Sequence, residues 1–248
     1  MPEISIIIVT LQNRDEIEFL NQLNEFTDEK VEVIIRNDKG ICEARNSGIK
    51  EATTDKIIFL DDDAYPCEEY VSRAQENLEK HNIVAGRVID TGHPWVGKTV
   101  SHYDQGDQRK VTNELVGCNM AFRKDVFKTI GMFDEDIQWG HDEKELIDRA
   151  LAEYEILYDP EMAVEHPYAS DIADYWKKQY RLGVADVWYW KKRKNSVGQE
   201  ILTSSLSPKE YIDYSIRGTL VKIPGGVAKT YGRLRGYQRL RNGSDIFG

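Results

Sequence analysis

The first 60 residues alternate between short apolar runs and helical patterns, and this alternation most constrains the fold. Continuous apolar, β-branched runs occur at 4–10 (ISIIIVT), 31–36 (VEVIIR) and 56–60 (KIIFL), which is typical of strands with both faces covered. Between them, residues 14–26 and 40–52 carry apolar side chains at helical spacing. A β-α-β-α-β order predicts a parallel sheet with right-handed crossover helices.

The rest of the chain continues this alternation and then becomes helical. The patterns predict a helix over 68–80, a strand over 83–89, a polar loop over 90–112, a strand and short helix within 117–135, a helix over 139–154, a strand with a turn over 155–167, and helices beyond residue 170. We therefore expect an α/β fold with a mostly parallel central sheet flanked by helices. One domain over 1–169 and a C-terminal helical extension over 170–248 is the simplest division.

The charge is distributed unevenly between these two parts. From residue 170 onward the chain carries 15 Lys/Arg and 7 Asp/Glu, a net +8, whereas the first 169 residues carry 18 and 36, a net −18. A basic extension is expected to contact anionic lipid or a phosphorylated acceptor, or else to form a solvated basic face packed on the acidic domain. Nucleic acid is excluded as a partner because the main body is acidic.

Cysteine usage and hydropathy bear on the cellular compartment. The three cysteines, Cys42, Cys67 and Cys118, have no metal-ligand spacing, and an odd number argues against a disulfide framework. We therefore expect a reducing, cytoplasmic location. No basic segment precedes the first apolar run, and no window approaches the roughly 18 uncharged residues of a membrane span. Any membrane contact is expected to be peripheral, at the inner face.

Three consecutive aspartates, Asp61, Asp62 and Asp63, follow the third predicted strand. In open parallel sheets, ligands bind at the carboxyl ends of the strands. Carboxylates there suit Mg²⁺ or Mn²⁺, which commonly bridge protein carboxylates and substrate phosphates, and a cation relieves the repulsion among the aspartates. The alternative is that Asp63 or a neighbour caps the following helix, which needs only one such residue. The triplet therefore predicts a metal or phosphate site.

A second acidic pair, Asp142 and Glu143, begins the helix predicted after residue 139. We expect both to face inward because they lie one turn before the apolar residues of that helix, and Glu145 and Asp148 to point elsewhere. An inward carboxylate within reach of a hydroxyl is a candidate general base, and the alternative is a helix-dipole partner. The apolar residues in question are Leu146, Ile147, Ala150 and Leu151.

His166 follows the last strand predicted in the first domain. A lone histidine is more often structural than a ligand, but a position after the helix with the candidate base also allows a metal-site location. Trp139, just ahead of the acidic pair, is expected either to stack on a sugar ring or to pack in the hydrophobic core.

Taken together, five stretches of the sequence resemble family 2 glycosyltransferases of the GT-A fold, a Rossmann-like α/β architecture. The resemblance covers roughly residues 4–167. It is carried by FLDDDAYP, GCNMAFRKDVFKTIGMFDE and WGHDEKELIDRALAEYEILYDPEMAVEHP, with VTLQNR (9–14) and KGICEARNSGI (39–49) matching the donor-binding half. By this resemblance, residues 1–90 form a nucleotide-sugar-binding half and 91–169 an acceptor and base half.

The resemblance implies an inverting, metal-dependent transfer from a nucleotide-diphosphate sugar to an acceptor hydroxyl of a glycan or lipid-linked glycan. Asp61–Asp63 then corresponds to the D-x-D motif, with Asp63 and Asp61 as ligands of Mn²⁺ or Mg²⁺ and His166 matching a histidine ligand of some members. Glu143 falls at the position of the catalytic base, beside Asp142, and Trp139 would contact the acceptor. The implied nucleotide-sugar-binding residues are Thr10, Arg14, Asp38, Arg45, Asp61 and Asp62.

The sequence departs from the family pattern in two places. The usual acidic loop after the second strand is shortened to RNDKG, in which Asp38 is the candidate replacement for the base-contacting aspartate. The acidic pair also reads Asp-Glu instead of Glu-Asp.

Alternative functions and partners stay open at this point. A nucleotidyltransferase would need a similar cation and diphosphate site, and a non-catalytic nucleotide- or carbohydrate-binding module needs no base. Aromatic residues mixed with Lys and Arg in 173–194, and the basic segment 232–241, suggest a membrane-interface surface. The alternatives are a helix packed on the catalytic domain and a homodimer contact.

Overall fold

The computed structural model describes residues 1–20, 30–97, 99–100, 102–213 and 215–247, which form two compact units. Unit 1 comprises residues 1–90, 102–136 and 142–167. Unit 2 comprises residues 91–101, 137–141 and 168–248. The segments 91–101 and 137–141, which the sequence analysis placed in the first domain, therefore belong to the unit that contains the C-terminal extension.

Unit 1 is built on one mixed sheet with the strand order β2-β1-β3-β7-β5-β8-β4, and β6 also pairs with β8. Five strands run in one direction, and β4, β6 and β7 run in the opposite direction. The expected α/β fold with a mostly parallel sheet is confirmed. The strands are β1 (Ile4–Val9), β2 (Val31–Arg36), β3 (Lys56–Leu60), β4 (Tyr65–Pro66), β5 (Ile83–Asp90), β6 (Lys110–Thr112), β7 (Asn119–Arg123) and β8 (Ile156–His166).

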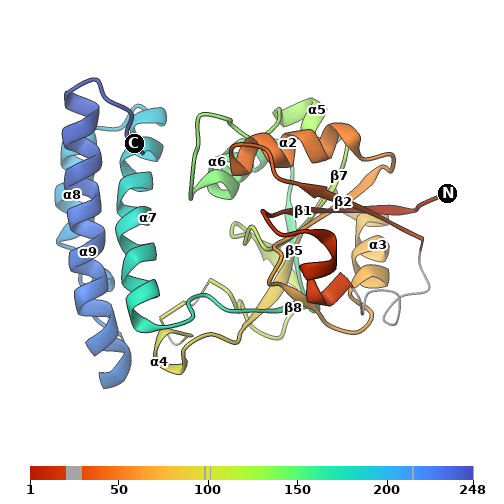
Figure 1. Ribbon diagram of the computed structural model, residues 1–248, viewed down its shortest axis with the longest axis horizontal. Coiled ribbons are helices and arrows are strands. Elements are labelled where there is room, and N and C mark those ends of the chain that lie inside the picture. Colours follow the sequence, from red (N-terminus) through yellow and green to blue (C-terminus); the bar gives the residue numbers. More distant parts are fainter. Residues whose placement is uncertain (21–29, 98, 101, 214, 248) are drawn as a thin grey trace. The chain divides into compact units, whose positions relative to one another are not determined.

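Helices cover both faces of this sheet, because the side chains of a strand alternate between its faces. Ile7 and Phe59 are register partners, and their face receives α2 (Ile41–Glu51) and α5 (Val126–Ile130): Gly48 meets Ile7, and the rings of Phe59 and Phe127 lie 6.3 Å apart. The opposite face receives α3 (Tyr70–Lys80), whose Tyr70 hydroxyl donates to Asn119 at 2.8 Å (Figure 1).

Two predicted elements of unit 1 differ in extent. The helix predicted over 139–154 is α6, and it spans only Asp142–Ala150. It cannot extend backwards as a regular helix because Gly140 (φ 73°) and His141 (φ 61°) adopt left-handed conformations. Of the helix predicted over 14–26, residues 14–16 form a short 3-10 helix, η1 (Arg14–Glu16), and residues 21–26 lie outside the described residues.

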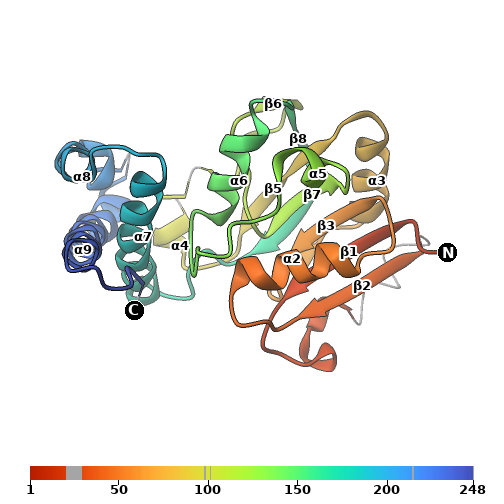
Figure 2. The same cartoon turned by 90° about the horizontal axis from the view of Figure 1, so that it is seen from above.

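Unit 2 is helical, as expected. Its long helices α7 and α9 run side by side (Figure 1), and Figure 2 shows α9 nearly end-on. Glycines bring the two backbones together: a Cβ added to Gly183 would lie 2.0 Å from the carbonyl oxygen of Lys229, and one added to Gly232 would lie 2.1 Å from that of Tyr180. The elements are α4 (Pro94–Gly97), α7 (Ile172–Lys192), α8 (Val197–Ser205), η2 (Pro208–Glu210) and α9 (Ile216–Arg241).

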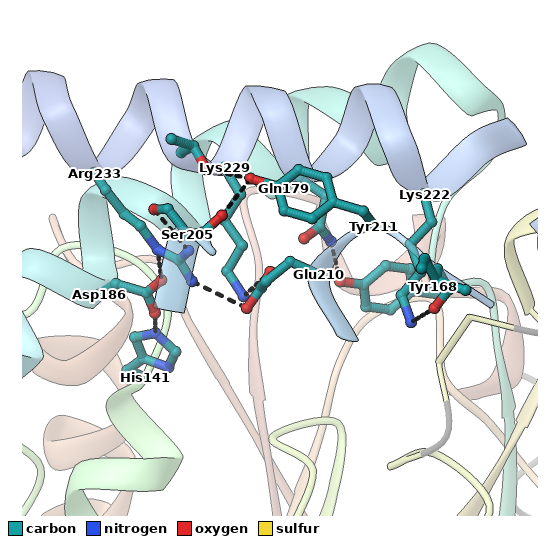
Figure 3. Close-up of polar contacts among 12 residues, drawn as sticks. His141, Tyr168, Gln179, Asp186, Ser205, Glu210, Tyr211, Lys222, Lys229 and Arg233 are labelled. Carbon is teal, nitrogen blue, oxygen red and sulfur yellow. Dashed lines mark hydrogen bonds and ion pairs between the residues drawn. The ribbon is translucent and has the colours of Figure 1, made fainter. Parts of the chain in front are cut away.

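A buried polar network ties the elements of unit 2 together (Figure 3). Asp186 of α7 accepts a hydrogen bond from Nε of Arg233 on α9 at 2.7 Å, and its other oxygen lies 2.7 Å from Nε2 of His141. Arg233 also donates to Glu210 of η2 at 3.1 Å. Only 2% of Arg233 is exposed, so the network fixes a charged group that would be costly to bury alone.

Within the part of the chain that the structure describes, no helix has both the length and the apolar character that crossing a bilayer requires.

Candidate active site

The polar residues singled out in the sequence gather at one edge of the sheet of unit 1. Thr10 follows β1, Asp38 follows β2, Asp61–Asp63 follow β3, and His166 ends β8. These four strands run in the same direction, so their carboxyl ends share one edge. Ligands of open α/β sheets bind at this edge.

His166 lies against two of the three aspartates. Its Nε2 atom is 3.1 Å from Oδ1 of Asp63 and 3.7 Å from Oδ2 of Asp61. The hydroxyl of Tyr103, which is buried, lies 3.0 Å from the other ring nitrogen, Nδ1, and so orients the imidazole towards the carboxylates. A second hydrogen bond that fixes the ring is a usual feature of metal-ligating histidines.

Cys118 also lies at this edge, and the sequence analysis gave it no role there. Its sulfur, an Asp61 oxygen and a His166 nitrogen all lie within 4.8 Å of one another. The topology explains this position: β7 is antiparallel to β3, so its first residues, not its last, lie beside Asp61. Only the strand direction reveals the proximity, because no ligand spacing in the sequence marks Cys118.

The donor atoms of this cluster fit a hard cation that also accepts nitrogen. Two carboxylates suit Mg²⁺ or Mn²⁺, and the imidazole suits Mn²⁺ better, because Mg²⁺ binds almost entirely to oxygen. Burial holds the pKa of the Cys118 thiol well above its usual range. Thiol sulfur is a soft donor, and Mg²⁺ and Mn²⁺ prefer the carboxylates and the imidazole to it. Burial also raises the pKa of Asp61, and the negative charges of Asp63 and Asp62 raise this pKa further.

The aspartate triplet does not cap a helix. Residues 61–64 connect β3 to the short strand β4, and α3 begins later, at Tyr70, after Glu69, whose side chain makes no capping hydrogen bond. The capping alternative is therefore wrong. Asp62 instead accepts a hydrogen bond from Oγ1 of Thr10, which links the ends of β1 and β3.

Two other predicted donor-binding residues occupy different environments. Asp38 is held by the guanidinium of Arg36 through two 2.8 Å hydrogen bonds and by the hydroxyl of Ser47 at 3.2 Å. The hydrogen bond from Arg36 keeps the pKa of Asp38 below its usual value, so the carboxylate is ionised. Arg14 is exposed at the start of η1.

Arg45 lies in the interior of unit 1 and forms an ion pair with Asp142. Both side chains are 4% exposed. The guanidinium also packs over the ring of Phe133, with 5.2 Å from its carbon to the ring centroid, and lies 3.4 Å from the carbonyl oxygen of Gly117. Arg45 was predicted to bind the nucleotide sugar. In the structure its guanidinium holds Asp142 in the first turn of α6.

The two members of the acidic pair differ in their surroundings. Asp142 is buried and paired with Arg45, whereas Glu143 is half-buried, and its carboxylate makes no hydrogen bond or ion pair among the described residues. Glu143 therefore keeps its oxygens for a ligand. Glu145, expected to point away, is instead buried and bonded to Arg149 at 2.7 Å, while Leu151, expected in the buried face, is 38% exposed.

Trp139 belongs to unit 2, where the guanidinium of Arg181 lies 4.0 Å from its ring centroid. The ring is half-buried, and one of its faces carries this cation–π contact.

Comparison with known proteins identifies the family. Residues 3–131, about half of the chain, match the family described as Glycosyl transferase family 2. The chain belongs to this family. It is therefore a glycosyltransferase, and the resemblance noted from the sequence motifs is confirmed.

Two curated glycosyltransferases are similar to this chain. Glycosyltransferase AglE of Haloferax volcanii is 23% identical over 206 residues, which cover 77% of this chain and 67% of AglE. The dTDP-rhamnosyl transferase RfbF of Shigella flexneri is 25% identical over 153 residues, which cover 55% of this chain and 51% of RfbF. The chain thus spans between half and two thirds of the length of these glycosyltransferases.

Among solved structures, S. aureus TarS shares the fold of this glycosyltransferase. The TM-score is 0.50 with 15% sequence identity, and the match covers 75% of this chain and 39% of TarS. At this identity the similarity concerns the fold alone, and it agrees with the α/β architecture of unit 1.

Proposed function

We propose that this glycosyltransferase transfers a sugar from a nucleotide-diphosphate donor to an acceptor hydroxyl, with inversion at the anomeric carbon. Three features of unit 1 support the proposal: the Asp61, Asp63 and His166 cluster, its place at the carboxyl edge of the sheet, and the carboxylate of Glu143, which has no hydrogen-bond or ion-pair partner among the described residues. The acceptor class that we propose is a glycan or a lipid-linked glycan.

Asp61, Asp63 and His166 are the residues that would hold a divalent cation, with Mn²⁺ favoured over Mg²⁺ by the imidazole. A cation bound there would stabilise the negative charge of the leaving nucleoside diphosphate. Tyr103 keeps His166 oriented, and Thr10 keeps Asp62 directed along the end of β3. Asp62 and Asp38 are the carboxylates that we assign to the hydroxyls and base of the donor, with Arg14 as the exposed cation near its phosphates.

Glu143 is the proposed general base, and the pairing of its neighbour carries this assignment. Asp142 is engaged by a buried arginine, so Glu143 is the member of the pair that retains a free carboxylate. In the reaction, the acceptor oxygen forms a bond to the anomeric carbon while the bond from that carbon to the diphosphate oxygen breaks. Glu143 takes the hydroxyl proton of the acceptor, and the diphosphate leaves with the bonding electron pair.

The name of one curated relative suggests which nucleotide sugar to test first as the donor. RfbF is named a dTDP-rhamnosyl transferase, which makes dTDP-rhamnose the first donor to test here. Trp139 is the residue that we propose to contact the acceptor sugar by stacking, and the guanidinium of Arg181 packs on one face of its ring.

The experiment incubates the full chain with UDP-, GDP-, dTDP- and CMP-linked sugars, with Mn²⁺, with Mg²⁺, and with a chelator. We expect one donor class to release its free nucleotide only when a cation is present, and more rapidly when glycan acceptors are added. Incorporation of pyrophosphate into the donor would instead indicate a nucleotidyltransferase. Cation-dependent donor binding without any release under all acceptor conditions would indicate a non-catalytic binding module. Product anomericity, read by NMR, tests inversion: retention of configuration would contradict a single displacement with Glu143 as base.

A further inference from the structure

Helix α9 presents a row of large apolar side chains to solvent. We call this row the α9 stripe; its residues and their exposed fractions are Ile216 (82%), Leu220 (59%), Ile223 (45%), Val227 (59%), Tyr231 (56%) and Leu234 (52%). Because successive residues of a helix are about 100° apart, these six positions span an arc of only about 80° on the helix surface.

The face of α9 opposite the stripe is the one that packs within unit 2. A Cβ added to Gly225 would lie 2.6 Å from the ring of Tyr175, and one added to Gly236 would lie 3.3 Å from the side chain of Val187. A surface helix ordinarily turns its large apolar residues towards the core. In α9 the arrangement is reversed, because the packed face consists largely of glycine: Gly218, Gly225, Gly226, Gly232 and Gly236 are all buried.

The charge of α9 is entirely positive. Its 26 residues include seven Lys or Arg and no Asp or Glu. Arg217 and Arg235 are exposed about 100° around the helix from Ile216, along one side of the stripe. Arg241 is exposed at the end of the helix. An apolar stripe flanked by arginines, on a helix too polar to span a bilayer, is the composition of helices that lie in the lipid headgroup region.

Aromatic residues of α7 adjoin the stripe. The rings of Tyr180 and Tyr231 lie 5.8 Å apart, and Tyr180 lines an open, apolar hollow together with Ala173, Trp176, Lys177 and Arg181. Tyrosine and tryptophan are favoured where an apolar region meets water, because each has an apolar ring and a polar atom. The indole nitrogen of Trp176 donates a hydrogen bond to the carbonyl oxygen of Val221, so this tryptophan side chain is held against α9.

We propose that the α9 stripe lies on the surface of an anionic lipid bilayer, with its apolar residues at the acyl boundary and its arginines among the headgroups. Charge decides between this partner and a second copy of the chain: two α9 helices packed stripe to stripe would bring together the exposed Arg217, Arg235 and Arg241 of both copies, with no acidic residue of α9 to compensate them. This surface lies in 216–241 and so includes the predicted basic segment 232–241. It differs from the other predicted contact, at 173–194, where Tyr175, Tyr189 and Trp190 are buried.

The test is co-sedimentation of the full chain with phosphatidylcholine vesicles that either contain or lack phosphatidylglycerol. We expect binding to the anionic vesicles, with affinity falling as salt is raised. Substituting Leu220→Glu, Val227→Glu and Leu234→Glu together should weaken that binding at least about 10-fold, because it removes buried apolar area and adds like charge. A matched control with Leu11→Glu, Val111→Glu and Leu151→Glu makes the same charge change at exposed apolar positions of unit 1 and should bind at least 10-fold more tightly than the stripe variant.

Circular dichroism and thermal unfolding of both triple variants check that the fold is kept. We expect both variants to fold, because all six substituted side chains are exposed. Equal binding of wild-type chain and stripe variant, or no binding to anionic vesicles, would overturn the proposal. A concentration-dependent dimer in light scattering that the stripe variant abolishes, without vesicle binding, would overturn it in favour of a second copy. None of these outcomes depends on the proposed sugar transfer, because vesicle binding is measured without donor or acceptor.

Discussion

Arg45 of α2 and Asp142 of α6 form a buried ion pair although 97 positions separate them in the chain. The pair joins α2 to the first turn of α6, which carries the proposed base. Because Arg45 satisfies Asp142, the adjacent Glu143 is the carboxylate that remains for chemistry.

Replacing Glu143 with glutamine should stop turnover and preserve donor binding. The amide keeps the size of the side chain and cannot accept a proton, so kcat should fall by the roughly 10²- to 10⁴-fold typical of a general base. Donor affinity should stay within a factor of about three, as measured by calorimetry with Mn²⁺. Asp148→Asn, in the same helix, is the matched control and should leave kcat near the wild-type value. Wild-type turnover in Glu143→Gln would remove the base assignment.

Breaking the Arg45–Asp142 pair should destabilise unit 1. Removal of one partner of a buried ion pair leaves the other charge uncompensated, at a cost of about 3 kcal/mol. We therefore expect Arg45→Met and Asp142→Asn each to lower the free energy of unfolding in urea by about this amount, and the double variant to lose clearly less than the sum. Strictly additive losses would show that the two side chains do not interact.

Substitutions in and beside the proposed cation site should differ in how strongly they weaken Mn²⁺ binding. Asp63→Asn and His166→Gln each remove a proposed ligand, so the Mn²⁺ concentration needed for donor binding should rise at least about 10-fold. Cys118→Ser should leave it nearly unchanged, because Mn²⁺ prefers oxygen and nitrogen donors to thiol sulfur. Electron paramagnetic resonance of bound Mn²⁺ reads the affinity directly. A large loss in Cys118→Ser with no loss in His166→Gln would contradict the proposed ligand set.

Sequence patterns predict an element correctly where the residues of that segment alone determine its structure and burial. The continuous β-branched runs of β1 and β3 predict buried parallel strands, and from these follows the position of Asp61–Asp63 at a carboxyl edge. The direction of β7 is not visible in its residues, because NMAFR reads alike in a parallel or an antiparallel strand. Cys118 was therefore missed, although it lies beside Asp61.

Other residues depend on partners far along the chain. Arg45 lies in a segment that resembles the donor-binding half of the family, but its environment is set by Asp142 and Phe133. Glu145 is buried because Arg149, one turn later, compensates its charge, which an apolar periodicity argument does not consider. Tyr189 and Trp190 look like a surface pattern among lysines, yet the helix buries them against its neighbours.

Acid should destabilise unit 2 through Asp186. Burial by itself would raise the pKa of this carboxyl, but the hydrogen bond from His141 and the charges of Lys229 and Arg233 outweigh it and hold the pKa well below its usual range. The unfolded chain then binds a proton at higher pH than the folded one does. The stabilisation from Asp186 is present above the unfolded pKa of about 4 and is lost progressively as pH falls below that value towards the lower pKa of the folded state.

Asp186→Asn tests this assignment, because asparagine keeps the shape and cannot ionise. At neutral pH the variant should lose about 3 kcal/mol of unfolding free energy, since Arg233 stays buried without its main counter-charge. Below pH 4 the difference between wild type and variant should shrink, because the wild type loses the same interaction by protonation. Thermal unfolding of both proteins between neutral and acid pH measures this convergence, and Asp174→Asn, at a half-buried position near the start of α7, controls for a general loss of negative charge. A stability difference that stays constant down to acid pH would show that Asp186 is not ionised in the folded chain, and that in the network of Figure 3 it meets Arg233 as a neutral carboxyl group.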